Sequence, residues 1–357
     1  MKISIYGDSF VTSEIFKSAL INQIGNDHNF KLKDVNWPDT PFHNDFGEGN
    51  FSKIKEYLGN EEDVVNFIED SEILVTDLAP VSESILDNVK NLKYIGVSRG
   101  GPVNIDIEAC KKKSIIVANA PGRNASAVAE FTVAKILAQT RLITLGHTTL
   151  MQGEWRGDLY RLDKTGRELS ELTIGLIGYS HIGKLVKNLL VPFGCKIVFS
   201  DPYVELNKED IADGIKKVSL ENLLEISDVV SIHARVTKET VNLIGKKEIS
   251  LMKKDSYLIN TARGPLLDYE ALHDALSNGK LKGAALDTFY EEPLPENHIF
   301  KMIKAGAKIA NTAADIFNDA EIIVKVKEPQ KVEVDMIKEN QIVYTYLHLA
   351  AAKELTE

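Results

Sequence analysis

A glycine-rich turn followed by a carboxylate is the strongest chemical signal in the sequence. The segment LTIGLIGYSHIGKLVKNLL passes from an apolar run into a turn at residues 178–183, called the phosphate turn below, and then into helix-like spacing. Asp201 closes the next apolar run, KIVFSD, 23 residues after Gly178. Such a turn binds a pyrophosphate at a helix N-terminus, and the acid accepts hydrogen bonds from both ribose hydroxyls. An aspartate repels a 2′-phosphate, so the pattern favours NAD over NADP.

The middle position of the phosphate turn departs from the usual glycine pattern. Ser180 stands where a glycine would let the backbone approach the pyrophosphate, and it weakens binding unless its hydroxyl donates to a phosphate. We expect the backbone amides of His181 and Ile182, together with Gly178 and Gly183, to complete the cofactor site. The alternative is a turn with a structural role only. It does not explain why a strand, a glycine-rich turn, a helix and an acid follow one another at the spacing of a dinucleotide site.

Three further polar residues follow strand-like runs. Arg263 comes after SYLINTA and would project from the carboxyl edge of a sheet, where open α/β folds bind ligands. A guanidinium there can hold a carboxylate in a fork and polarise a carbonyl, although a surface ion pair is the alternative. Asp287 at another strand end and Glu292 before Pro293 would, standing alone, be solvated loop acids.

Apolar runs that alternate with helix-like segments must position these residues. The runs fall into two series, at residues 3–7, 72–78, 92–98 and 114–120, and then at 172–178, 195–201, 228–234, 256–262 and 283–289. Uninterrupted apolar runs are typical of strands buried on both faces of a parallel sheet. We therefore predict two α/β units, the second a five-stranded doubly wound sheet, connected by a helix over 125–141. Weak periodicity over 25–60 predicts an irregular loop.

Composition and charge limit the possible partners. The 357 residues are 44% hydrophobic and 26% charged, with a net charge of −10, which suits a globular chain of two ordinary domains and predicts no nucleic-acid partner. Cys110 and Cys195 have no metal-like spacing and predict neither a disulfide framework nor a metal site. The chain contains no 18-residue apolar stretch and no signal peptide at its start, so we expect a cytoplasmic protein without membrane contact.

Through these residues the chain resembles the D-isomer-specific 2-hydroxyacid dehydrogenase family. The resemblance covers residues 70–302 and rests on the phosphate turn and on SIIVANAPG, SAVAEFTVAKILAQTR, MKKDSYLINTARGPLLDYEAL and GAALDTFYEEPLP. It implies two Rossmann-like domains: a flavodoxin-like substrate domain over 1–120, and a doubly wound NAD-binding domain with a linking helix over 121–302. It also implies a homodimer that transfers hydride between NAD(H) and a small 2-hydroxy or 2-keto acid.

The resemblance assigns the substrate-side roles by position. Arg263 becomes the substrate-orienting arginine, and Glu292 becomes the carboxylate that tunes a catalytic histidine. The backbone amides of Arg99, Gly100 and Gly101 surround the substrate carboxylate.

On the cofactor side, the resemblance adds Thr261 and places Asp287 near the nicotinamide carboxamide. His233 either lies near the adenosine half of the cofactor or is a structural residue at a strand end. The family's acid/base histidine, in a Thr-Pro-His context, has no counterpart, because the nearest position by spacing is Ala313. We expect His298, which is close in sequence, to lie on the surface.

From about Met302 the sequence resembles the N-terminal domain of alanine dehydrogenase, and 303–357 is therefore an atypical C-terminal segment. There, a Lys-Glu-Pro lysine binds the pyruvate carboxylate and a Leu-His-Leu-Ala-Ala histidine is catalytic; Lys327 and His348 match them, 21 residues apart. Two alternatives follow: an NAD-binding chimera or truncation with little catalysis, and an amino-acid dehydrogenase. We expect His348 to be inactive, because catalysis requires precise placement by supporting residues.

Overall fold

The computed structural model divides the chain into two units, Met1–Pro295 and Glu296–Glu357. It describes residues 1–38, 46–295, 297–300, 314, 317–318, 322–325, 335–338 and 341–345. In the second unit β12 (Ile322–Lys325) pairs in parallel with β13 (Ile342–Thr345). Ala313, Lys327 and His348 lie outside the described residues, so the predictions on them are not addressed by the structure. None of the helices described is long and apolar enough to cross a membrane.

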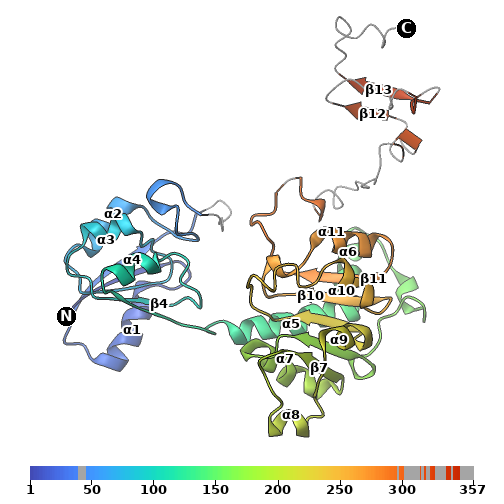
Figure 1. The fold of residues 1–357 in the computed structure, drawn as a ribbon, viewed down its shortest axis with the longest axis horizontal. Helices are drawn as coiled ribbons and strands as arrows, with labels where there is room; N and C mark the ends of the chain where they lie inside the picture. Colours follow the sequence, from blue (N-terminus) through green and yellow to red (C-terminus); the bar gives the residue numbers. More distant parts are fainter. Residues whose placement is uncertain are drawn as a thin grey trace, which may run out of the picture. The chain divides into compact units, whose positions relative to one another are not determined.

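The first sheet has five parallel strands in the order β2-β1-β3-β4-β5. This is the flavodoxin-like order expected for the first domain. Its strands are β1 (Lys2–Asp8), β2 (Asn29–Val35), β3 (Ile73–Thr76), β4 (Tyr94–Val97) and β5 (Ile116–Asn119). The helices that connect them are α1 (Ser13–Ile24), α2 (Glu61–Ile68), α3 (Glu83–Asn88) and α4 (Ile107–Lys112) (Figure 1). Each helix begins at a side-chain cap, on Thr12, Asn60, Ser82 and Asp106 respectively.

Strand β2 shows that the prediction of an irregular loop over residues 25–60 was wrong for residues 29–35. The strand pairs along its whole length with β1, at the edge of the sheet. Lys31 packs its ammonium over the ring of Phe67, and Lys33 packs over Tyr6, so each charge remains near solvent while its stem covers apolar surface. An edge strand with lysines therefore lacks the apolar run that marks a buried strand.

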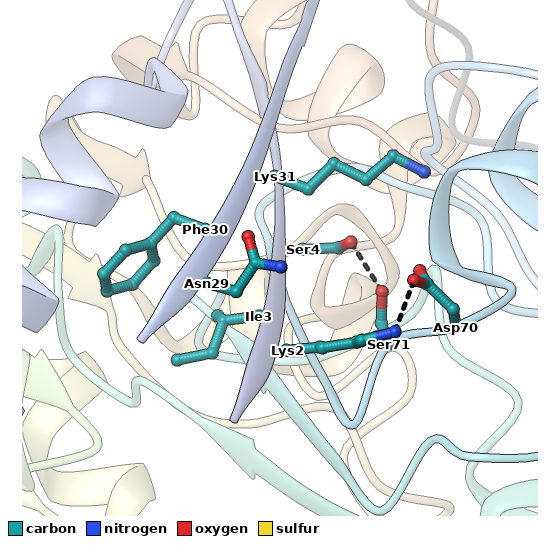
Figure 2. A pocket seen from close by; sticks show the side chains of 8 residues that line it. All are labelled: Lys2, Ile3, Ser4, Asn29, Phe30, Lys31, Asp70 and Ser71. Carbon is teal, nitrogen blue, oxygen red and sulfur yellow. Dashed lines mark hydrogen bonds and ion pairs between the residues drawn. The ribbon is translucent and has the colours of Figure 1, made fainter. Parts of the chain in front are cut away.

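A hollow of about 190 Å³ lies at the amino ends of β1 and β2 (Figure 2). Four of its polar side chains form two pairs: Lys2 with Asp70 at 2.9 Å, and Ser4 with Ser71 at 2.6 Å. Ligands of parallel sheets bind at the opposite, carboxyl edge. The hollow is therefore separate from the candidate site.

The second sheet has six parallel strands in the order β11-β10-β9-β6-β7-β8. This is the doubly wound dinucleotide-binding order, which reverses between β6 and β9. Its strands are β6 (Thr173–Ile177), β7 (Lys196–Ser200), β8 (Lys216–Lys217), β9 (Val229–Ile232), β10 (Ser256–Asn260) and β11 (Leu281–Leu286). The five predicted strands are confirmed, but the count was wrong, because β8 is a two-residue edge strand of lysines and carries no apolar signal.

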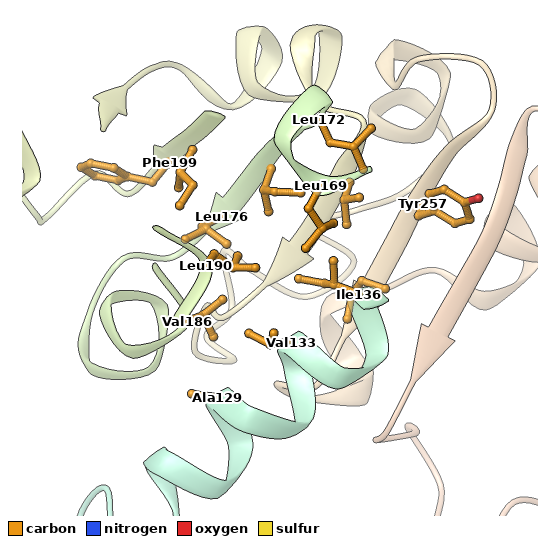
Figure 3. Close-up of a cluster of buried hydrophobic side chains, with 14 of the residues drawn as sticks. Ala129, Val133, Ile136, Leu169, Leu172, Leu176, Val186, Leu190, Phe199 and Tyr257 are labelled. Atoms are coloured by element: carbon orange, nitrogen blue, oxygen red, sulfur yellow. The ribbon is translucent and has the colours of Figure 1, made fainter. Parts of the chain in front are cut away.

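The connecting helix predicted over 125–141 is α5 (Ala125–Thr140), which packs on the second sheet (Figure 3). Ala129, Val133 and Ile136 of this helix join one buried cluster with residues of the sheet such as Leu176 and Phe199. Burial of such side chains contributes roughly 1.5–3 kcal/mol each. The remaining helices are α6 (Ile143–Met151), α7 (His181–Leu190), α8 (Lys208–Ala212), α9 (Leu220–Ile226), α10 (Lys246–Leu251) and α11 (Tyr269–Ser277).

Candidate active site

The phosphate turn connects β6 to the first turn of α7, and both of its terminal glycines are required by close backbone contacts. Gly178 has φ +90°, and a Cβ on it would lie 2.8 Å from the backbone nitrogen of Ala234. A Cβ on Gly183 would lie 2.5 Å from the carbonyl oxygen of Gly178. Neither position therefore accommodates a side chain without movement of the backbone.

Ser180 fits the middle of the phosphate turn without strain. Its φ of −85° is accessible to any L-residue, and its side chain makes no capping hydrogen bond to α7. The side chain is exposed, so the hydroxyl is available to a phosphate. The amides of His181 and Ile182 donate to no acceptor among the described residues, as is usual for the first turn of a helix. These groups together fit a bound pyrophosphate.

Asp201 follows β7 directly and is held by two backbone amides. Its Oδ2 accepts a hydrogen bond from the amide of Tyr179 at 2.8 Å, and its Oδ1 accepts one from the amide of Tyr203 at 2.8 Å. A carboxylate oxygen accepts more than one hydrogen bond, so both oxygens retain lone pairs for ribose hydroxyls. The geometry therefore fits the adenosine ribose of NAD.

His233 lies against the phosphate turn and is buried. The nearest atoms to a Cβ on Gly178 include the carbonyl carbon of His233, at 2.8 Å. Burial lowers the pKa of His233 to about 4, so the ring is neutral at neutral pH. Its Nε2 lies 3.0 Å from Oγ of Ser231, and its Nδ1 is buried with no partner among the described residues. A buried nitrogen without a hydrogen-bond partner, in a residue beside the phosphate turn, is consistent with a contact to a ligand.

Thr261 follows β10, and its hydroxyl ties this strand to α5. Oγ1 of Thr261 lies 2.7 Å from Oγ1 of Thr132, which donates to the carbonyl oxygen of Val128 at 2.7 Å. Thr261 is therefore the donor in this pair, and only its lone pairs and backbone remain for a ligand.

Arg263 and Asp287 are both hydrogen-bonded to Asn260, the last residue of β10. The Asn260 side-chain amide donates to the carbonyl oxygen of Arg263 at 3.0 Å, and the backbone amide of Asp287 donates to the backbone carbonyl oxygen of Asn260 at 3.0 Å. The exposed guanidinium of Arg263 donates to the carbonyl oxygen of Ala262 at 2.7 Å. Among the described residues no carboxylate forms an ion pair with it, so the surface-pair alternative finds no support there.

Glu292 is half-buried in the loop after β11, where its Oε1 accepts a hydrogen bond from the amide of Phe289 at 2.7 Å. His298 belongs to the second unit. It is half-buried and its Nδ1 accepts from the amide of Phe300 at 3.3 Å, and its surface position stays a prediction.

The loop after β4 carries the residues expected at the substrate carboxylate. The Arg99 guanidinium donates to the carbonyl oxygen of Glu56 at 2.9 Å and pairs with the Glu56 carboxylate. Its own amide and those of Gly100 and Gly101 donate to no acceptor within the described parts of the chain. The Asn119 side chain holds the carbonyl oxygen of Gly100 at 2.7 Å. These contacts hold the loop in place. Its backbone amides are therefore available to bind an anion, whereas the Arg99 side chain is already bound to Glu56.

A buried polar cluster at the carboxyl edge of the first sheet was missed by the sequence analysis. Asp77, 2% exposed, pairs with Arg123 at 2.8 Å and accepts a hydrogen bond from Ser98. Asp8, at the end of β1, has one buried oxygen without a partner among the described residues, and burial raises its pKa. The available signal was an aspartate after two of the apolar runs, Asp8 after ISIYG and Asp77 after EILVT, as Asp201 closes KIVFSD.

A doubly wound sheet with a glycine-rich turn after its first strand and a carboxylate after its second, preceded by a flavodoxin-like sheet, is the architecture of a dinucleotide-binding α/β protein of two domains. Family comparison is more specific. The model for the NAD binding domain of D-isomer specific 2-hydroxyacid dehydrogenases matches residues 133–312. The chain belongs to this family, and it is an NAD-dependent oxidoreductase of the 2-hydroxyacid dehydrogenase type.

Individual relatives agree with this assignment. A glyoxylate reductase from Thermofilum pendens is 40% identical over 245 residues, covering 68% of this chain and 72% of that protein. A D-3-phosphoglycerate dehydrogenase from Methanocaldococcus jannaschii is 35% identical over 246 residues, which are 68% of this chain but only 46% of that protein. The structure of a D-isomer specific 2-hydroxyacid dehydrogenase from Lactobacillus delbrueckii ssp. bulgaricus, complexed with NAD, aligns with a TM-score of 0.66 and 25% identity over 87% of each chain.

A second family model matches the end of the chain. The N-terminal domain of alanine dehydrogenase/PNT matches residues 300–357. The resemblance noted from the Lys-Glu-Pro and Leu-His-Leu-Ala-Ala motifs is therefore confirmed at the level of family.

Proposed function

We propose that the chain transfers hydride between NAD(H) and C2 of a small 2-hydroxy or 2-keto acid. The observation that carries this proposal is the exposed guanidinium of Arg263, which lacks a carboxylate partner among the described residues and follows a strand of the cofactor-binding sheet. The reduced nicotinamide supplies the hydride from its C4. Arg263 orients the substrate and polarises its carbonyl, and the amides of Arg99, Gly100 and Gly101 bind its carboxylate.

The same proposal gives the cofactor a defined set of contacts. The phosphate turn binds the pyrophosphate through the amides of His181 and Ile182 and the hydroxyl of Ser180. Asp201 accepts the ribose hydroxyls. His233 and Thr261 lie along the cofactor, and Asp287 receives the nicotinamide carboxamide.

Proton delivery is the step with the least support in this chain. The family's histidine position is nearest to Ala313, and alanine carries no proton. Loss of a general acid typically costs about 10²- to 10⁴-fold, so we propose slow turnover in which water protonates the C2 oxygen.

A second candidate is an NAD-binding chimera or truncated protein with little or no catalysis. The match of residues 300–357 to a domain from another dehydrogenase family favours it. We propose three parts for the chain: a substrate-binding domain over 1–120, an NAD-binding domain over 121–302, and a segment that resembles alanine dehydrogenase over 303–357. Separate buried clusters under the two sheets support the first of these boundaries.

We propose that the protein is a cytoplasmic homodimer. Apolar side chains are exposed in and after α6, including Trp155 at 85%, Tyr160 at 96% and Leu162 at 95%. Such a concentration is typical of an interface, and a second copy is the partner that family membership suggests. Both cysteines are free, as suits a reducing compartment.

Two measurements on the full chain separate the candidates. Titration of NADH fluorescence measures cofactor binding, and NADH oxidation with glyoxylate, hydroxypyruvate and pyruvate, with and without ammonia, measures turnover. Slow oxidation with a keto acid and no ammonia requirement is expected. Tight NADH binding without any oxidation would leave the catalytically silent chimera, and an ammonia requirement would favour the amino-acid dehydrogenase.

A further inference from the structure

Tyr179, between Gly178 and Ser180 in the phosphate turn, is completely buried. Its ring stacks on Phe199 of β7 with the ring centroids 3.9 Å apart. Its hydroxyl donates to Oδ1 of Asp210 at 2.7 Å, while its backbone amide donates to Oδ2 of Asp201 at 2.8 Å. One residue thus connects the ribose-binding carboxylate to a second acid on α8.

Asp210 belongs to a buried ionic cluster with Lys187 of α7. Both side chains are almost inaccessible, at 1% and 2% exposed. The Lys187 ammonium lies 3.4 Å from Oδ1 of Asp210 and 2.9 Å from Oδ2 of Asp213. Burial lowers the pKa of Lys187, but the hydrogen bond to Asp213 and the charges of Asp213, Glu209 and Asp210 outweigh it and raise the pKa overall. The lysine therefore remains charged, and buried charges of this kind require fixed partners.

The Asp210 carboxylate is held from both sides. At the start of α8 its Oδ2 accepts from the amide of Asn207 at 3.2 Å, and the Asn207 side chain accepts from the amide of Asp210 at 2.8 Å. Burial, and then the hydrogen bond to Asp210, raise the pKa of Tyr179, so its phenol keeps the proton that it donates. The contacts form a closed path from α7 through Lys187, Asp210 and Tyr179 back to the phosphate turn.

We propose that Tyr179 is a positioning residue of the NAD site: its hydroxyl, anchored on Asp210 and Lys187, fixes the turn whose amide orients the Asp201 carboxylate. This inference rests on the proposed cofactor site. Tyr179 acts on the cofactor through Asp201 and the turn, and it does not touch the reacting atoms. A residue that contacts a ligand is placed precisely only when neighbouring residues hold it in position. Its loss therefore weakens NADH binding and leaves the chemical step intact once the cofactor is saturating.

Tyr179→Phe tests the proposal, with Tyr257→Phe as the matched control. Tyr257 is a buried tyrosine of the same core, and its hydroxyl has no hydrogen-bond partner among the described residues. By NADH fluorescence, we expect the Kd of Tyr179→Phe to rise about tenfold, equivalent to about 1.4 kcal/mol, and that of Tyr257→Phe to stay within about twofold of wild type. The kcat at saturating NADH should be unchanged in both variants.

Several results would overturn the proposal. These are a Kd for Tyr179→Phe within twofold of wild type, an equal rise in the control, or a fall in kcat without a change in Kd. If Tyr179→Phe does not fold, Asp213→Asn is the second variant, because it weakens the contact of Lys187 at the more exposed side of the ionic cluster. The Kd for NADH should then rise at least threefold, and an unchanged Kd contradicts the proposal. Wild-type protein that binds no NADH refutes the cofactor site itself, whereas wild-type binding with an unaffected Tyr179→Phe refutes only this inference.

Discussion

The backbone amide of Tyr179 donates a 2.8 Å hydrogen bond to the carboxylate of Asp201, so the phosphate turn and this carboxylate form one hydrogen-bonded unit. The carboxyl ends of β6 and β7 are adjacent, which makes this contact possible. The second oxygen of Asp201 is held by the amide of Tyr203. Both oxygens of the carboxylate are therefore held in place, as the proposed contact with the two ribose hydroxyls requires.

Asp201→Asn should weaken NADH binding and reduce the preference for NADH over NADPH. A hydrogen bond to a charged group contributes roughly 1.5–3 kcal/mol, so we expect the Kd for NADH to rise about 10- to 100-fold. Binding of NADPH should improve, because the repulsion of the 2′-phosphate is removed. Fluorescence titration with both cofactors measures these changes. Asp274→Asn, at an exposed side chain of α11, is the control, and an unchanged NADH-to-NADPH ratio in Asp201→Asn contradicts the assignment.

His233 should make the stability of the fold depend on pH in a defined window. Its folded pKa of about 4 lies below the unfolded value of about 6.5, so the unfolded chain binds more protons between these values. The contribution to stability is complete above pH 6.5 and is lost as the pH falls toward 4, by at most about 1.4 kcal/mol per pH unit. Urea denaturation of wild type and His233→Gln from pH 7.5 to 4.5 measures it. The free energy of unfolding should fall more steeply in the wild type; parallel curves would contradict the prediction.

The sequence allowed prediction of those features whose cause is local. Buried strands such as β6 and β10 are continuous apolar runs, and the phosphate turn is recognisable because its glycines are required by backbone contacts. The strand β2 was missed because its lysines cover apolar rings from the edge of the sheet. Hydrogen bonds between residues far apart in the sequence could not be predicted either: Thr132 and Thr261 are 129 residues apart, and Arg99 and Glu56 are 43 apart. No local pattern specifies such partners, because tertiary packing selects them.

Leu162→Glu should separate the proposed homodimer into monomers. Leu162 is 95% exposed, in the segment that follows α6, and a charge placed in an apolar interface loses its hydration without gaining a partner. Light scattering of the full chain measures the molar mass, with Ile15→Glu on α1 as the control at an exposed apolar site of the first domain. A wild-type mass of one chain, or a dimer unaffected by Leu162→Glu, contradicts the proposed interface.

Arg263→Lys should impair the reduction of keto acids while leaving cofactor binding intact. Lysine keeps the positive charge but loses the planar fork that can hold a carboxylate and a carbonyl oxygen together. Removal of one group that stabilises developing charge typically costs about 10²- to 10³-fold in kcat, so we expect a loss in kcat/KM of this order with glyoxylate or hydroxypyruvate. The Kd for NADH should remain within twofold of wild type, because the proposal places the Arg263 guanidinium, which donates to the carbonyl oxygen of Ala262, on the substrate and not on the cofactor. Arg167→Lys, at an exposed arginine that pairs with Asp228, is the control for loss of a guanidinium elsewhere. Equal activity of Arg263→Lys and wild type would remove Arg263 from the catalytic site, and a parallel loss of NADH affinity would reassign it to the cofactor.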